Sequence, residues 1–149
     1  MKKTRIMAFG TFDGLHKGHL DLFKQSRALA LNPYLIVSIA RDSNVERIKG
    51  EKPLFNEDTR MKIVKKSSLV DKVVLGAKKD YLSHIVKEKP AIIALGYDQK
   101  YYVANLKNNL LVLGLKVKIY RLKSFKAYIY KNRLIKLKKL KPRRSKSQG

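Results

Sequence analysis

Gly10-Thr11-Phe12-Asp13-Gly14-Leu15-His16-Lys17-Gly18-His19 connects a short apolar run, residues 6–9, to an amphipathic segment, and the expected architecture follows from this connection. The apolar run is typical of a buried strand and the amphipathic segment of a helix. Gly10 and Gly14 permit close backbone approach, and free N–H groups at a helix start favour phosphate. Two histidines three residues apart can point into one pocket and donate hydrogen bonds to phosphate oxygens. The connection predicts a phosphate site rather than a metal site, because no third ligand lies at suitable spacing.

Apolar runs and helical segments alternate along the rest of the chain. Strands are expected over residues 5–9, 34–40, 70–75, 91–95 and 115–120. The last of these alternates apolar residues with lysines, as a half-exposed edge strand does. Helices are expected over residues 18–30, from a cap at Asn56 to about 68, from a cap at Asp80 to Pro90, and between 100 and 113. This order predicts an α/β fold with an open parallel five-stranded sheet and helices on both faces.

Composition narrows the class of protein further. The 149 residues suit one domain, and no run of about 18 apolar residues predicts a membrane span. Cysteine is absent, which excludes thiolate nucleophiles and fits a reducing cytoplasm, the expected location. The net charge is +24, and the last acidic residue is Asp98, so the final third of the chain is entirely basic or neutral. Such asymmetry indicates a polyanionic partner or a solvated lysine-rich surface.

The charge pattern also divides the chain. Residues 1–122 are expected to form the α/β domain, residues 123–141 a basic C-terminal helix of the same domain, and residues 142–149 a disordered basic tail. Weak, sequence-independent nucleic-acid binding is expected of this basic end. His84, the third histidine, is expected on an exposed helix face.

The connection after the first strand resembles the HxGH signature of the cytidylyltransferase-like nucleotidyltransferases. The form G-T-F-D-x-x-H-x-G-H directly after that strand is specific to this family. The resemblance continues through Ala40-Arg41-Asp42, Lys49-Gly50-Glu51-Lys52-Pro53-Leu54, residues 56–60, residues 70–76 and Leu95-Gly96-Tyr97-Asp98-Gln99, and covers about residues 4–122. It implies a Rossmann-like fold, Mg²⁺ or another divalent cation held mainly by the nucleotide phosphates, and in-line attack without a covalent enzyme intermediate.

The resemblance also implies roles for individual residues. His16 and His19 would stabilise the transition state at the α-phosphate, and Lys52 would be a third catalytic residue. The nucleotide-binding residues would be Gly10, Thr11, Phe12, His16, Lys17, Gly18, His19, Asp98, Ser124 and Lys126. The acceptor-binding residues would be Asp13, Lys49 and Arg60, although Asp13 is also suited to holding its own loop by side-chain-to-backbone bonds. The resemblance implies no metal ligands from the protein.

One segment departs from the family pattern. Members carry a Ser/Thr-rich motif after the last strand, and here Ala127 and Tyr128 occupy the expected Thr and Ser positions. Ser124, Lys123, Lys126 and backbone amides would have to substitute for the lost hydroxyls.

The acceptor is open to more than one interpretation. F-G-T-F-D-G-x-H-K-G-H together with L-G-Y-D-Q most resembles the archaeal-type FAD synthases, which adenylylate FMN and release pyrophosphate. Glycerol-3-phosphate cytidylyltransferases share the first loop and are the alternative, so ATP and CTP both stay open as partners. A third interpretation is a former enzyme that now binds a nucleotide or RNA. The resemblance is also compatible with a homodimer.

Overall fold

One parallel sheet forms the centre of the molecule. The structure, a computed structural model, describes residues 2–99 and 105–125. The strands are β1 (Thr4–Gly10), β2 (Pro33–Ile39), β3 (Lys72–Leu75), β4 (Ile92–Leu95) and β5 (Lys118–Arg121). They pair in the order β3-β2-β1-β4-β5, with every pairing parallel. The predicted fold class is therefore confirmed, and the lysine-alternating strand lies at an edge of the sheet.

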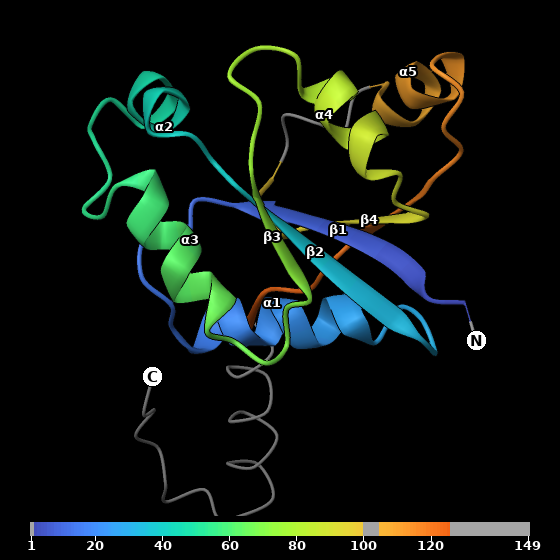
Figure 1. Cartoon of the computed structure of the whole chain (residues 1–149), viewed down its shortest axis with the longest axis horizontal. Coiled ribbons are helices and arrows are strands. Elements are labelled where there is room, and N and C mark those ends of the chain that lie inside the picture. Colours follow the sequence, from blue (N-terminus) through green and yellow to red (C-terminus); the bar gives the residue numbers. More distant parts are fainter. Residues whose placement is uncertain (1, 100–104, 126–149) are drawn as a thin grey trace, which may run out of the picture.

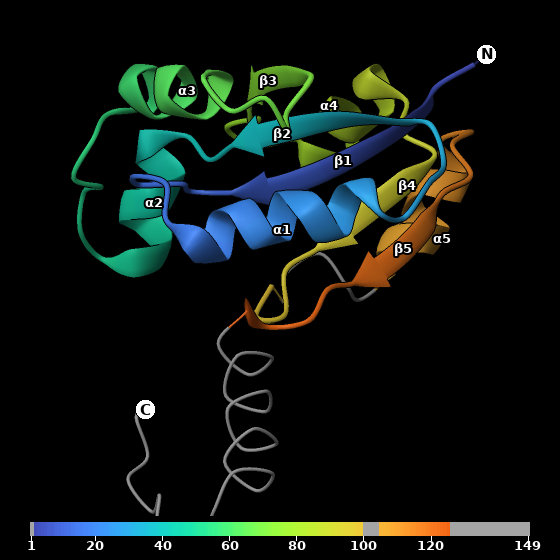
Figure 2. The same cartoon turned by 90° about the horizontal axis from the view of Figure 1, so that it is seen from below.

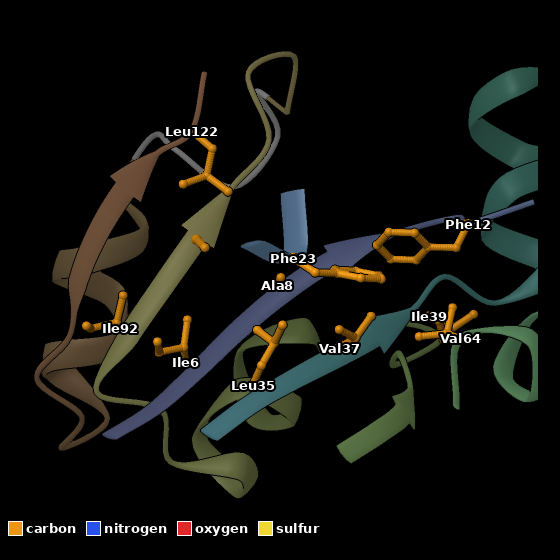
Figure 3. Close-up of a cluster of buried hydrophobic side chains, with 11 residues drawn as sticks. Ile6, Ala8, Phe12, Phe23, Leu35, Val37, Ile39, Val64, Ile92 and Leu122 are labelled. Atoms are coloured by element: carbon orange, nitrogen blue, oxygen red, sulfur yellow. The ribbon is translucent and has the colours of Figure 1, made fainter. Parts of the chain in front are cut away.

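Helices cover both faces of this sheet. α1 (Lys17–Arg27) and α3 (Glu57–Lys65) lie on one face, and α4 (Tyr81–Glu88) and α5 (Leu106–Val112) lie on the other (Figure 1). Successive residues of β1 serve the two faces in turn, because side chains alternate along a strand. Ile6 and Ala8 pack in the cluster with α1 and α3, whereas Met7 and Phe9 pack with α4 and α5. Figure 3 shows the first cluster, in which the rings of Phe12 and Phe23 contact each other near the carboxyl end of β1.

The strand order creates a crevice at one edge of the sheet. β1 lies in the middle, with β2 on one side and β4 on the other. The chain leaves β1 toward the face of α1 and leaves β4 toward the face of α5, so the two connections diverge (Figure 1). Ligands of open parallel sheets bind at such a divergence, outside the carboxyl ends of the strands.

One helix was not expected from the sequence. α2 (Asp42–Lys49) follows β2 and lies beyond the carboxyl ends of the strands, near the start of α1 (Figure 2). Only Val45 of this helix is buried, so its sequence carries no apolar periodicity that would reveal it. Gly50 ends it with a φ of 82°, a conformation that favours glycine.

Two other expectations concern membranes and the C-terminal segment. No helix within residues 2–99 and 105–125 combines the length and the apolar character needed to cross a bilayer. The basic helix expected over residues 123–141 lies outside the described residues from position 126 onward, as does the tail expected over residues 142–149.

Candidate functional site

A cavity of about 1050 Å³ opens at the carboxyl ends of β1 and β4. Its walls come from the loop after β1, helix α1 as far as Gln25, helix α2, the loop after β4 and the segment after β5. Nine of the ten predicted nucleotide-binding residues line it: Gly10, Thr11, Phe12, His16, Lys17, Gly18, His19, Asp98 and Ser124. The tenth, Lys126, lies outside the described residues.

The two histidines form a mutual cap at the start of α1. The Gly18 N–H donates to Nδ1 of His16 at 3.0 Å, and the His16 N–H donates to Nδ1 of His19 at 3.3 Å. The rings stack with centroids 3.7 Å apart. Because each Nδ1 accepts a backbone N–H, the proton of each neutral ring is on Nε2. The capping arrangement therefore fixes the tautomer that can donate to an oxygen of a ligand.

His19 stays neutral over a wide pH range. Burial is the main cause that lowers its pKa to about 4, and the electrostatic effect of the neighbouring His16 lowers it further. A hydrogen bond with the Gly14 backbone acts in the opposite direction but is outweighed. The edge of the Phe12 ring packs against His19 with centroids 5.1 Å apart, which contributes to the apolar surroundings. A neutral donor at neutral pH is the result.

Glycines make room for this arrangement. A Cβ at Gly18 would lie 2.9 Å from Cε1 of His16, so a larger residue would displace the ring. A Cβ at Gly10 would lie 2.6 Å from two atoms of the Phe12 ring. Phe12 itself has a φ of 53°, a left-handed conformation that is rare for an aromatic residue. Its nearly complete burial against Phe23 holds it there.

Asp13 ties the loop after β1 to the segment before α3. Its two carboxylate oxygens accept the N–H groups of Leu54 at 2.6 Å and Phe55 at 2.8 Å. Desolvation raises the pKa of Asp13, but these two bonds and the positive charges of Arg60 and Lys49 outweigh it, so the pKa lies below its ordinary value. Asp13 lines the cavity, yet its hydrogen bonds serve the local structure.

Arg60 occupies a different place from the one predicted for an acceptor-binding residue. It is completely buried and does not line the cavity. Its guanidinium donates to the carbonyl of Phe55 at 2.9 Å, the carbonyl of Thr11 at 2.8 Å and the carboxylate of Asp42 at 2.6 Å. In this structure Arg60 therefore has no exposed surface with which to contact an acceptor, and it joins three segments beneath the site.

Asp42, the acidic partner of Arg60, and Glu57 also join α2 to α3. The N–H of Asp42 donates to Glu57 at 2.8 Å, and the N–H of Glu57 donates to Asp42 at 3.1 Å. Each carboxylate thus lies at the start of the other helix, where the helix dipole favours negative charge. Arg41 adds bonds to Glu57 and to the carbonyl of Gly76. Arg41 and Asp42 therefore connect α2 to α3 and to the segment after β3.

The remaining predicted residues are divided between the cavity and the surface. Lys49, at the end of α2, and Asp98, after β4, both line the cavity. Lys52 is exposed in the connection between α2 and α3 and is not among the lining residues. The structure thus brings together the histidine pair, Lys49 and Asp98 but leaves Lys52 apart from them.

The loop after β4 is held by two residues that the sequence analysis did not single out. The Gln99 side chain accepts the Gly96 N–H at 2.9 Å and donates to the Phe9 carbonyl at 2.8 Å. It thereby links the ends of β1 and β4, at the point where the connections that follow these two strands diverge. Nη1 of Arg121 lies within hydrogen-bond distance of the carbonyls of Gly96 and Gln99, at 2.8 and 2.6 Å. Gln99 belongs to the L-G-Y-D-Q motif, but the sequence gives no sign that either Gln99 or Arg121 holds this loop.

His84 differs from its expectation as an exposed helix residue. It is half-buried on α4, and its Nε2 lies 2.8 Å from Oγ of the buried Ser38 on β2. Burial is the main cause that lowers its pKa. The bond satisfies a hydroxyl that would otherwise be buried without a partner, which explains why a polar pair is tolerated there.

The assembled cavity suits a phosphate chain. It combines the start of α1, two imidazoles whose Nε2 atoms can donate, and the cationic side chains of Lys17, Lys49 and Lys123. Such donors, fixed before a ligand arrives, stabilise charge that develops on phosphoryl oxygens.

Comparison with known proteins agrees with this chemistry. The family model described as "Cytidylyltransferase-like" matches residues 7–145. An FAD synthase of Thermoplasma volcanium is 40% identical over 81% of this chain and 83% of its own length. An FAD synthase of Methanosarcina barkeri is 43% identical over 80% of this chain and 83% of its own length.

A solved structure extends the similarity to three dimensions. The crystal structure of the lipopolysaccharide core biosynthesis protein from Thermoplasma volcanium superposes with a TM-score of 0.77 at 39% identity, covering 83% of this chain and 99% of that one. The family match spans most of the sequence, and the fold and the histidine signature agree with it. The chain belongs to the cytidylyltransferase-like family.

Proposed function

We propose that this protein is an FMN adenylyltransferase, which transfers the adenylyl group of ATP to the phosphate of FMN and releases pyrophosphate. The observation that carries the proposal is the stacked histidine pair at the start of α1, inside a cavity of about 1050 Å³. FAD synthases that are 40% and 43% identical over about four fifths of the chain support FMN as the acceptor. The cysteine-free composition supports the cytoplasm as the place of this reaction.

The geometry supports a single in-line displacement. A phosphate oxygen of FMN attacks the α-phosphorus of ATP, and the bond from that phosphorus to the oxygen leading to the β-phosphate breaks. Negative charge grows on the oxygens of the α-phosphate and on the departing pyrophosphate. The Nε2–H groups of His16 and His19 are the donors that the capping arrangement fixes for this charge. Lys17, Lys49 and Lys123 supply positive charge around the same cavity.

The divalent cation implied by the family fits this site only together with the nucleotide. Within residues 2–99 and 105–125, no group of three or more His, Cys, Asp or Glu side chains could hold a metal ion. Mg²⁺ accepts one or two carboxylates plus phosphate oxygens, and Asp98 lines the cavity. When bound with ATP, the cation would neutralise charge on the phosphate chain.

The test is a pyrophosphate-release assay with each of the four common nucleoside triphosphates and three acceptors: FMN, riboflavin and glycerol 3-phosphate. We expect turnover with ATP and FMN in the presence of Mg²⁺, with FAD as the product. Equal turnover with riboflavin would contradict the acceptor assignment. Turnover restricted to CTP and glycerol 3-phosphate would replace it with cytidylyl transfer. A protein that is inactive with every pair would favour a role in binding.

A further inference from the structure

Gln25, on the second half of α1, forms a two-way bridge to Lys123. Its Nε2 donates to the Lys123 carbonyl at 2.9 Å, and its Oε1 accepts the Lys123 N–H at 2.9 Å. The Gln25 amide thus bonds to the Lys123 backbone through one donor and one acceptor, as the backbone of a neighbouring strand would. Backbone pairing between this segment and β4 ends one residue earlier, at the bond from the Leu122 N–H to the Leu95 carbonyl. Gln25 therefore holds the chain by hydrogen bonds at the residue that directly follows its last backbone bond to the sheet.

Asp21 sets the orientation of this bridge. One of its carboxylate oxygens accepts a hydrogen bond from Nε2 of Gln25 at 2.6 Å. Only the nitrogen end of an amide can donate, so this bond determines which end of the Gln25 amide faces the Lys123 carbonyl. The bridge is thus a chain of three residues, with two of them one helical turn apart on α1.

The bridged segment forms one wall of the cavity. Lys123, Ser124 and Phe125 all line it, together with His16 and Gly18 at the start of α1. Cβ of Phe125 lies 3.9 Å from the position that a Cβ of Gly18 would occupy. Displacement of the segment by a few tenths of an ångström would therefore move an ammonium and a hydroxyl relative to the histidine pair.

We propose that Gln25 is a positioning residue that holds residues 123–125 as a wall of the nucleotide site, so that affinity for the triphosphate depends on its amide. The inference rests on the proposed function for the reaction, but its ligand, ATP, can be tested without any acceptor. Loss of the bridge should loosen the wall and leave the sheet unchanged.

The test uses the full chain with Gln25→Glu, which can still accept but cannot donate, and Gln25→Met, which can do neither. Lys24→Gln is the matched control, because it alters an exposed neighbour on the same helix that does not line the cavity. Calorimetry gives the Kd for ATP and for pyrophosphate without FMN, and flavin fluorescence gives the Kd for FMN. We expect Gln25→Met, which loses both bridge bonds, to weaken ATP and pyrophosphate binding about tenfold, and Gln25→Glu, which keeps the bond from the Lys123 N–H, to weaken them about threefold. FMN binding and the Lys24→Gln control should change less than about twofold.

Wild-type affinity for ATP in either Gln25 variant would overturn the proposal. Equal losses of ATP and FMN affinity would also overturn it, because they would assign Gln25 to general stability. If Gln25→Glu or Gln25→Met does not fold, Asp21→Ala provides the test, since it keeps Gln25 but frees its amide. If the wild-type protein binds ATP more tightly than the Gln25 variants do but does not convert FMN, the proposed function is wrong and this inference still holds.

Discussion

His16 caps α1 through its side chain and also stacks on His19 inside the cavity. The two contributions are separable, because asparagine is a strong helix cap but has no imidazole. We predict that His16→Ala lowers turnover by about 10²–10³ and lowers the free energy of unfolding by about 1 kcal/mol. His16→Asn should lower turnover equally but retain most of the stability. Pyrophosphate release and urea denaturation measure the two effects.

Lys24→Gln, with both properties unchanged, is the control for these variants. A folded His16→Asn protein with wild-type turnover would show that the imidazole is not needed, and the mechanism proposed above would be wrong.

His19 links stability to pH. An unfolded histidine takes up a proton near its ordinary pKa of 6.5, whereas folded His19 does so only at about pH 4. Between these values the unfolded state binds more protons, so the free energy of unfolding falls as the pH drops from 6.5 to 4. We predict that His19→Gln reduces this slope, as measured by urea denaturation across the interval. His84 also has a lowered pKa, so the double variant with His84→Gln should flatten the profile further. Equal slopes in wild type and His19→Gln would refute the assignment.

At the scale of the elements, Arg60 on α3 joins the loop after β1, the start of α2 and the segment before α3. The single ammonium of a lysine cannot reach three acceptors that a guanidinium satisfies together. We predict that Arg60→Lys lowers the free energy of unfolding by about 3 kcal/mol, measured by urea denaturation. Lys62→Gln, an exposed change on the same helix, is the control and should have little effect. An Arg60→Lys protein of wild-type stability with a raised KM for FMN would restore the acceptor-binding role predicted from the sequence.

The elements themselves were largely predictable, because their patterns are local. All five strands and four of the five helices in the described residues follow apolar periodicity and capping residues such as Asn56 and Asp80. α2 lacks that periodicity. Confirmation also came for the family and the fold class, and the cavity contains the histidine pair as expected.

Residue roles that depend on distant partners could not be predicted. Arg60 and Thr11 are 49 positions apart, and Gln25 and Lys123 are 98 apart, so no local pattern reveals either contact. A buried arginine and an exposed one also look the same in the sequence. For that reason the sequence predicts Arg60 at the acceptor and assigns no role to Arg121, Gln99 or Gln25.

At the scale of the whole molecule, we expect the basic C-terminal end to be separable from the part of the chain that catalyses the reaction. We predict that a chain ending at Lys141 retains adenylyl transfer, because the proposed site lies at the carboxyl ends of the strands. A chain ending at Lys123 should lose most activity, since Ser124 and Phe125 belong to one wall. Pyrophosphate release with ATP and FMN measures both truncations.

Nucleic-acid binding by the same truncations is the companion measurement. Residues 121–149 contain twelve basic residues, no acidic residue and three aromatic ones, Phe125, Tyr128 and Tyr130. So few stacking groups favour only salt-sensitive, sequence-independent binding. RNA affinity should fall steeply between about 50 and 200 mM salt and should be reduced by both truncations. Sequence-selective RNA binding at the higher salt, in a protein inactive with every acceptor, would favour the binding-protein interpretation.

The position of β1 between β2 and β4 has a consequence for synthesis on the ribosome. β1, β2 and β3 emerge first, together with the helices that cover one face of the sheet. The side chains of the opposite face, which include Met7, Phe9 and Ile36, stay uncovered until α4, β4 and α5 have been synthesised. At a translation rate of roughly 5–20 residues per second, completing the chain from β3 to β5 takes about 2–10 s. During that interval the nascent chain exposes the apolar side chains of this face, so we expect the unfinished chain to be more prone to aggregation than the finished molecule.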